Sequence, residues 1–151
     1  MQVTKKLNVS LDEFFDFVEK SIKYDIKNAT GEDIDQVVQG YSYEKTLANA
    51  LKQSGNVLTT IEKYERGSCY QSKVTSNQGF NYMTFDVAEI DDENVEVTYS
   101  EEFISHRKMN NLNYKFMLKL YKKRIDRRMN LLVENIELSI KQEKGSELCQ
   151  D

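Results

Sequence analysis

A long helical segment without Gly or Pro closes this chain, from Asn110 to about Gln142. Before it, five strand-like runs follow one another between Tyr41 and Ile104, and an amphipathic helical segment precedes those runs. A helix of this length has to bury its apolar side against another layer of structure, and the sheet is the only large layer in this chain. The order of the segments therefore predicts an α+β fold in which the last helix lies in the concave face of a curved antiparallel sheet.

The composition is typical of one globular domain. The chain has 151 residues, of which 39% are hydrophobic and 30% are charged, with a net charge of −4. No apolar run approaches the roughly 20 residues that a membrane span needs. The N-terminal residues lack the apolar core of a signal peptide, and Cys69 and Cys149 form no disulfide framework. These features predict a cytoplasmic protein.

The N-terminal residues predict a strand followed by a helix. Apolar residues alternate over Gln2–Val9, as in a strand with one buried face. Ser10 and Glu13 stand at the positions of a capping box, in which each side chain accepts a hydrogen bond from the backbone amide of the other residue. A helical periodicity starts at Leu11 and ends before Thr30–Gly31. One helix and two shorter helices are both compatible with this pattern.

Five further strands are predicted by alternating apolar residues between turn residues: Tyr41–Leu47, Val57–Tyr64, Ser68–Ser76, Phe80–Ile90 and Asn94–Ile104. Their short connections indicate an antiparallel meander with one buried face. All six glycines are interpreted as turn or cap positions between regular segments. We therefore expect a single domain over residues 1–142 and a frayed polar tail over residues 143–151.

The closing helix carries an apolar stripe with steps of three or four residues: Tyr114, Leu118, Tyr121, Ile125, Met129, Leu132, Ile136 and Ile140. We expect this stripe to lie on the sheet and to bury Leu118, Ile125, Met129, Leu132 and Ile136. A second stripe lies on another face of the first half of the helix: Met109, Leu112, Phe116 and Leu120. In a monomer, which we favour, the first helical segment or Ile34–Val38 covers the second stripe. In a homodimer two copies bury it against each other.

Three segments resemble a family of small proteins from Gram-positive bacteria that carries a domain of unknown function: VSLDEFFDF at 9–17, YSYEKT at 41–46 and NYKFMLKLYKKR at 113–124. This family is similar to the START-like (helix-grip, SRPBCC) superfamily, and the resemblance extends from about Gln2 to Gln142. It implies a curved antiparallel sheet of about six strands, wrapped around a long C-terminal helix, with a cavity between them. START-like relatives include lipid and hormone carriers, cyclases, hydratases and stress-response proteins. No catalytic motif of an enzymatic branch matches this sequence.

Such a cavity would be lined from the sheet and the closing helix, and the candidate ligand-binding residues are Tyr82, Phe85, Val97, Tyr99, Glu101, Phe103 and Tyr114. The aromatic rings would form an apolar pocket, and the tyrosine hydroxyls would supply a few polar contacts. Glu101 shares a strand face with Tyr99 and Phe103, and a buried carboxylate has to be paired, hydrogen-bonded or protonated. Glu101 could orient a ligand or act as an acid/base. Alternatively, it pairs with a Lys or Arg of the closing helix, or a bulge turns it outward.

Other chemistries have little support in the sequence. His106 is the only histidine, and we interpret it as an exposed residue at the junction of the last strand and the closing helix. No zinc-ligand pattern, Gly-rich phosphate loop, nucleophile elbow or HExxH motif occurs, so we predict no metal, cofactor or catalytic residue. The basic residues of 115–128 occupy the faces that the apolar stripe leaves free. Nucleic acid is therefore not an expected partner.

The favoured hypothesis is non-covalent binding of a small, largely apolar ligand between the sheet and the closing helix, without catalysis. The first alternative is a cyclase- or hydratase-like enzyme that uses Glu101 and tyrosine hydroxyls. The second alternative is a protein-interaction module that works through the start of the closing helix. One fold hosts many functions, so the fold alone does not choose among them.

Overall fold

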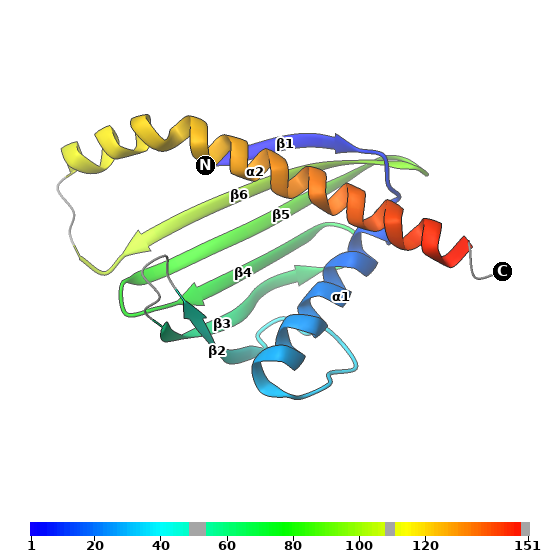
Figure 1. The fold of residues 1–151 in the computed structure, drawn as a ribbon, viewed down its shortest axis with the longest axis horizontal. Coiled ribbons are helices and arrows are strands. Elements are labelled where there is room, and N and C mark those ends of the chain that lie inside the picture. Colours follow the sequence, from blue (N-terminus) through cyan, green and yellow to red (C-terminus); the bar gives the residue numbers. More distant parts are fainter. Residues whose placement is uncertain (49–53, 108–110, 149–151) are drawn as a thin grey trace.

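The computed structural model describes residues 1–48, 54–107 and 111–148, and of residues 48, 54, 111–121, 124, 125 and 148 it describes only the backbone. The elements follow the predicted order: β1 (Gln2–Leu7), α1 (Leu11–Thr30), β2 (Ser42–Ala48), β3 (Ser54–Glu65), β4 (Cys69–Thr75), β5 (Gly79–Asp91), β6 (Asn94–Ser105) and α2 (Asn111–Leu148). The strands form one antiparallel sheet in the order β1-β6-β5-β4-β3-β2. Figure 1 shows both helices on the concave face of this sheet, which confirms the predicted α+β, helix-grip arrangement.

The chain crosses from one edge of the sheet to the other through α1. β1 pairs with β6 at one edge, whereas β2 lies at the opposite edge beside β3. α2 lies along β1 and β6, and α1 crosses towards β2 (Figure 1). The two helices meet where α1 begins and α2 ends, and they diverge towards the end of α1 and the beginning of α2. This divergence leaves part of the concave face between them without a helix above it.

α1 is a single helix with the predicted cap at its beginning. The Ser10 hydroxyl accepts from the Glu13 amide at 3.1 Å, and the Glu13 carboxylate accepts from the Ser10 amide at 3.2 Å. At the other end, Gly31 has φ of 77°, and its amide donates to the carbonyl of Lys27 at 2.8 Å. This left-handed conformation costs glycine little because glycine has no Cβ. The two caps therefore fix both ends of the helix.

α2 continues past Gln142 to Leu148, so the expectation of a frayed tail directly after Gln142 is wrong. Gly145 lies inside this helix and Gly55 lies inside β3, so these glycines do not separate regular segments as expected. The added turn lies beside α1: Lys20 pairs with Glu143 at 2.9 Å, and Lys144 lies 3.7 Å from the carboxylate of Glu13.

The buried face of α2 differs from the predicted stripe at one position. Met129, Ile136 and Ile140 are buried as expected, but Leu132 is 37% exposed and its neighbour Val133 is fully buried. A step of four residues from Met129 to Val133 stays closer to one helix face than a step of three residues to Leu132. Tyr114, Leu118, Tyr121 and Ile125, and the second stripe of Met109, Leu112, Phe116 and Leu120, lie outside the described side chains.

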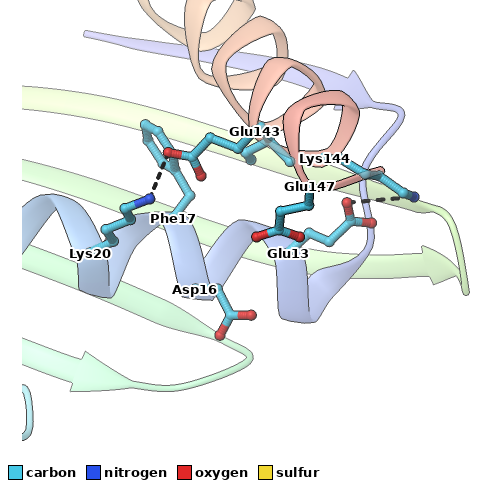
Figure 2. Close-up of a pocket in the computed structure, with 8 residues that line it drawn as sticks. Glu13, Asp16, Phe17, Lys20, Glu143, Lys144 and Glu147 are labelled. Atoms are coloured by element: carbon cyan, nitrogen blue, oxygen red, sulfur yellow. Dashed lines mark hydrogen bonds and ion pairs between the residues drawn. The ribbon is translucent and has the colours of Figure 1, made fainter. Parts of the chain in front are cut away.

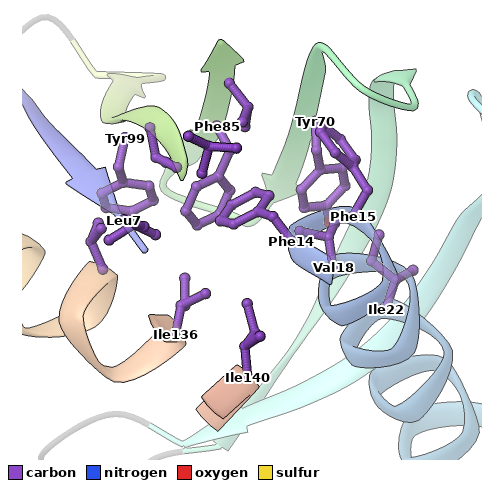
Figure 3. Close-up of a cluster of buried hydrophobic side chains, with 14 of the residues drawn as sticks. Leu7, Phe14, Phe15, Val18, Ile22, Tyr70, Phe85, Tyr99, Ile136 and Ile140 are labelled. Carbon is purple, nitrogen blue, oxygen red and sulfur yellow. The ribbon is translucent and has the colours of Figure 1, made fainter. Parts of the chain in front are cut away.

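The core lies between the concave face of the sheet and the buried sides of both helices (Figure 3). Phe14 is fully buried, and its ring centroid lies 5.7 Å from that of Phe15 and 6.0 Å from that of Phe85. The ring of Phe85 in turn lies 4.8 Å from that of Tyr99 on the next strand. Aromatic rings at these distances add to the burial of apolar area. The part of the concave face that lies under the beginning of α1 is therefore densely packed.

Candidate functional site

A pocket of about 330 Å³ opens on the concave face where the two helices diverge. We call it the inner pocket, and its lining residues come from α1, three strands of the sheet (β2, β4 and β5) and α2: Phe17, Val18, Ser21, Ile22, Asp25, Tyr43, Tyr70, Met83, Phe85, Leu132 and Ile136. Most of these side chains are aliphatic or aromatic. Ser21, Asp25 and the two tyrosine hydroxyls are the polar groups. Small-molecule sites in proteins have this composition and a volume of about 300–1,000 Å³.

The local sequence explains why α1 contributes both kinds of residue. Val18 and Ile22 are separated by four residues and face the sheet, and Ser21 and Asp25 follow the same spacing on the adjacent face. That adjacent face points towards the gap between the helices. α1 therefore supplies an apolar base and a polar edge to the same pocket.

Three tyrosines of the sheet donate hydrogen bonds to carboxylates that are also paired with a basic side chain. Tyr43 donates to Asp25, whose Oδ2 lies 2.8 Å from Lys45 Nζ. In the second pair, Tyr64 donates to Glu19, which also lies 3.2 Å from Arg66. In the third pair, Tyr99 donates to Glu101, which also lies 2.9 Å from Arg128. Two of the three pairs join the sheet to α1, and the third reaches α2 through Arg128.

Burial raises the pKa of each of these tyrosines above the usual value of 10.0. For Tyr43, Tyr64 and Tyr99, loss of water is the largest cause, and the hydrogen bond to the neighbouring carboxylate adds to it. Burial also raises the pKa of Tyr70 to about 12, and the neighbouring Ser72 hydroxyl opposes this rise. The tyrosines therefore stay neutral at pH 7 and present hydroxyl groups.

The structure separates the candidate ligand-binding residues. Phe85 lines the inner pocket. Val97 and Tyr99 lie on the concave face in the core, with 0% and 1% of their surface exposed. Tyr82 is an odd number of residues from Phe85 and pairs with Lys73, whose ammonium lies 5.7 Å from its ring, so Tyr82 lies on the opposite face of the sheet.

The remaining candidates lie nearer the far end of β6. Glu101 shares the concave face with Tyr99 and pairs across the strands with Met83, a pocket residue. Its ion pair with Arg128 confirms the alternative that it pairs with a basic residue of the closing helix. Phe103 is 42% exposed and borders a separate hollow of about 450 Å³ beside Asn77 and Arg107. The side chain of Tyr114 lies outside the described residues. Whether any of these residues binds a ligand stays a prediction.

Most residues of the inner pocket were missed by the sequence analysis, above all Ser21, Asp25, Tyr43 and Tyr70. One feature of the sequence could have identified Ser21 and Asp25. Polar residues next to the apolar stripe of an amphipathic helix, such as Ser21 and Asp25, line any gap that this helix borders. The positions of Tyr43 and Tyr70 in the pocket depend on where α1 crosses the sheet.

A second hollow, of about 350 Å³, lies between the beginning of α1 and the end of α2 (Figure 2). Its charged side chains partly neutralise one another, because Lys20 pairs with Glu143 and Lys144 approaches Glu13. Phe17 borders both this hollow and the inner pocket. Exposed ion pairs of this kind join two helices and do not by themselves form a ligand site.

His106 is exposed, and its ring packs at 4.8 Å against the ring of Phe80. Among the described residues, no group of three or more His, Cys, Asp or Glu side chains could hold a metal ion. In the same part of the chain, neither helix combines the length and the apolar character needed to cross a membrane.

Solved structures of low sequence identity share this fold. SA2116, a protein of unknown function from Staphylococcus aureus, is 13% identical, with 96% of each chain covered and a TM-score of 0.64. The Zhui aromatase/cyclase from Streptomyces sp. R1128 is 13% identical, with 91% of this chain and 92% of that chain covered and a TM-score of 0.55. A START superfamily protein from Mycobacterium smegmatis is 11% identical, with 87% and 97% covered and a TM-score of 0.50. These likenesses show the START-like fold.

Comparison with family models gives one match, and no curated protein matches the sequence. The model of the domain of unknown function DUF3284 matches residues 1–122, which include the whole sheet, α1 and the beginning of α2. The chain therefore belongs to the DUF3284 family.

Proposed function

We propose that this protein binds a small, largely apolar ligand in the inner pocket and does not transform it. The observation that carries the proposal is the pocket itself: about 330 Å³ between the sheet and both helices, lined mainly by aliphatic and aromatic side chains. Filling such a hollow with an apolar molecule removes apolar surface from water, at about 25 cal/mol per Å². The START-like fold is consistent with this function, although fold likeness alone assigns none.

The surroundings of Glu101 support a role in holding the structure together. Its Oε1 accepts from the Tyr99 hydroxyl, and its Oε2 lies 2.9 Å from a guanidinium nitrogen of Arg128. Both oxygens therefore already have partners from the protein. An acid/base residue would need a hydrogen bond to the reacting group, and we do not propose the enzyme alternative.

Binding of naphthalene, a rigid apolar probe, tests the proposal. We expect titration with naphthalene to shift the methyl NMR signals of Met83 and Leu132, because both residues line the inner pocket. Ser21 is exposed and lies at the edge of the pocket, so Ser21→Trp should place an indole ring in the opening with little effect on folding. The affinity of this variant for naphthalene should fall at least about tenfold.

Asn28→Trp is the matched control, because it adds the same side chain to an exposed position of α1 outside the pocket lining. This variant should bind naphthalene like the wild type. The proposal fails if the wild type does not bind the probe, or if Ser21→Trp binds it as well as Asn28→Trp does.

A further inference from the structure

The hydroxyl of Thr59 on β3 is the feature of the concave face that the fold leaves unexplained. The residue is only 4% exposed, and its Oγ1 has no hydrogen-bond partner within the described part of the chain. Burying a hydroxyl without a partner costs free energy, because the group loses its bonds to water and gains none in return. A buried polar atom of this kind needs a physical reason.

Other hydroxyls on neighbouring strands do have partners. Thr60, the next residue, shares a hydrogen bond of 2.8 Å with Ser42 on the outer face of the sheet. Thr4 and Thr98 are joined in the same way at 2.9 Å. These two pairs show that a hydroxyl in this sheet can find a partner on the neighbouring strand. The hydroxyl of Thr59 differs from them because it has no such partner among the described residues.

The strand register places Thr59 beside the inner pocket. Thr59 lies between Val57 and Ile61 in the alternation of β3, and all three residues are buried on the concave face. Across the β2–β3 pair it stands directly opposite Tyr43, which lines the pocket. Residues in directly opposite positions have Cβ atoms about 4.5–5.5 Å apart. Thr59 is not itself a lining residue and its Oγ1 is fully covered, so a ligand in contact with the Tyr43 ring would reach this hydroxyl by displacing the side chains that cover it.

The other hydroxyls near this position are already engaged. The Tyr43 hydroxyl donates a hydrogen bond to Asp25, and Ser72, the other buried polar residue of the described chain, lies beside the hydroxyl of Tyr70. Among these buried hydroxyls, Thr59 alone has an O–H group that donates no hydrogen bond and lone pairs that accept none.

We infer that Thr59 determines the ligand class of the inner pocket: an apolar body, aromatic or aliphatic, that carries one hydroxyl or carbonyl oxygen at its inner end. The inference rests on the proposed function, because it assumes that the inner pocket binds a ligand. The apolar body would occupy the space between Phe85 and Leu132, and its oxygen would supply the partner that the Thr59 hydroxyl lacks. A net hydrogen bond of ordinary strength corresponds to a preference of about three- to tenfold for the ligand with the oxygen.

A matched pair of probes tests this inference: naphthalene and 2-naphthol, which differ by one hydroxyl. Calorimetric titration of the wild type should give a threefold to tenfold higher affinity for 2-naphthol, a range set by one ordinary hydrogen bond. Thr59→Val keeps the shape of the side chain without its hydroxyl, so the preference should disappear while naphthalene binding is unchanged. Thr59→Ser keeps the hydroxyl and should keep the preference. Thr60→Val, on the outer face, should also leave it unchanged.

Thermal unfolding of the free protein gives the second readout. Because the Thr59 hydroxyl has no partner in the free protein, Thr59→Val should unfold at the same temperature as the wild type or at a higher one. The inference is overturned if this variant keeps the preference for 2-naphthol, or if it unfolds at a clearly lower temperature. If both probes bind the wild type equally well, only the inference fails. If neither probe binds, the proposed function fails and the inference fails with it.

Discussion

The two ends of the concave face are built from similar residues but differ in packing. Near the beginning of α1, the rings of Phe14 and Phe15 pack against each other in the core, and the hollow between the two helices there is lined mainly by charged side chains. Towards the end of α1, apolar residues such as Ile22 and Leu132 border the inner pocket. The presence of apolar residues therefore does not decide which end has an apolar pocket. The distance between the two helices decides it, because they meet at one end and diverge at the other (Figure 1).

The closed end is also the end where the two helices contact each other directly. Lys20 and Lys144 form ion pairs across α1 and α2 there. At the open end each helix is tied to the sheet separately: α1 through Asp25 and Tyr43, and α2 through Arg128 and Glu101. Two helices that are fixed independently can stay apart. The sheet, more than any contact between the helices, thus maintains the pocket.

Truncation of buried side chains should show the largest difference between the two ends. Phe14→Ala removes a fully buried ring from the closed end and should lower the free energy of unfolding by about 3–5 kcal/mol. Leu132→Ala removes a side chain that is 37% exposed and already borders a hollow, so it should cost only about 1 kcal/mol. Urea-induced unfolding measures both values.

Val133→Ala is the internal control for the open end. Val133 is fully buried next to Leu132, and its truncation removes two methyl groups from packed surroundings, at a cost of about 2 kcal/mol. The smaller truncation should therefore destabilise the protein more than the larger one. The reverse order would show that the assigned rotation of α2 about its axis is incorrect.

Alkaline pH should weaken the fold through its buried tyrosines. A buried tyrosine whose pKa is raised in the folded state makes its full contribution to stability below pH 10.0, the pKa of a tyrosine in the unfolded chain. This contribution is lost as the pH rises from 10.0 to the pKa of the tyrosine in the folded state. For Tyr70, whose pKa is raised to about 12, the loss is about 1.4 kcal/mol per pH unit between these limits. Urea-induced unfolding between pH 10 and pH 12 should therefore show a smaller slope against pH for Tyr70→Phe than for the wild type. An unchanged slope would contradict the burial of the Tyr70 hydroxyl.

The smallest expected effects concern the ion pairs that tie each helix to the sheet. Asp25→Asn weakens bonds to the buried Tyr43 and to Lys45, and it should cost about 1 kcal/mol. Glu101→Gln should cost less, because Arg128 is largely exposed and water screens its charge. Both effects should shrink in high salt. Chemical denaturation at two salt concentrations measures them.

Glu101→Gln also separates the hypotheses on function. If the protein only binds a ligand, this variant should keep naphthalene affinity within about twofold, since the affected oxygens bond to the protein itself. A much larger loss of affinity would show that the carboxylate takes part in the site.

Much of the fold could be predicted from the sequence because its signals are local. The capping box of Ser10 and Glu13, the alternation in the strands and the long closing helix each depend on neighbours within a few residues. The site was harder to predict. Tyr82 and Phe85 were grouped as candidates for one cavity, although an odd spacing puts them on opposite faces of β5. Asp25 and Tyr43 belong together only because α1 crosses β2.

The sequence by itself thus determined which elements form, their order and their antiparallel arrangement. The reason is that the spacing of apolar residues along a short stretch of chain distinguishes a helix from a strand. Only the tertiary structure decided which of Leu132 and Val133 is buried, since a stripe with steps of three and four fits two rotations of a helix. It also decided that α2 runs past Gly145, where the end of this helix lies beside α1. The inner pocket belongs to this second group: it exists because two helices, each fixed to the same curved sheet, diverge above it.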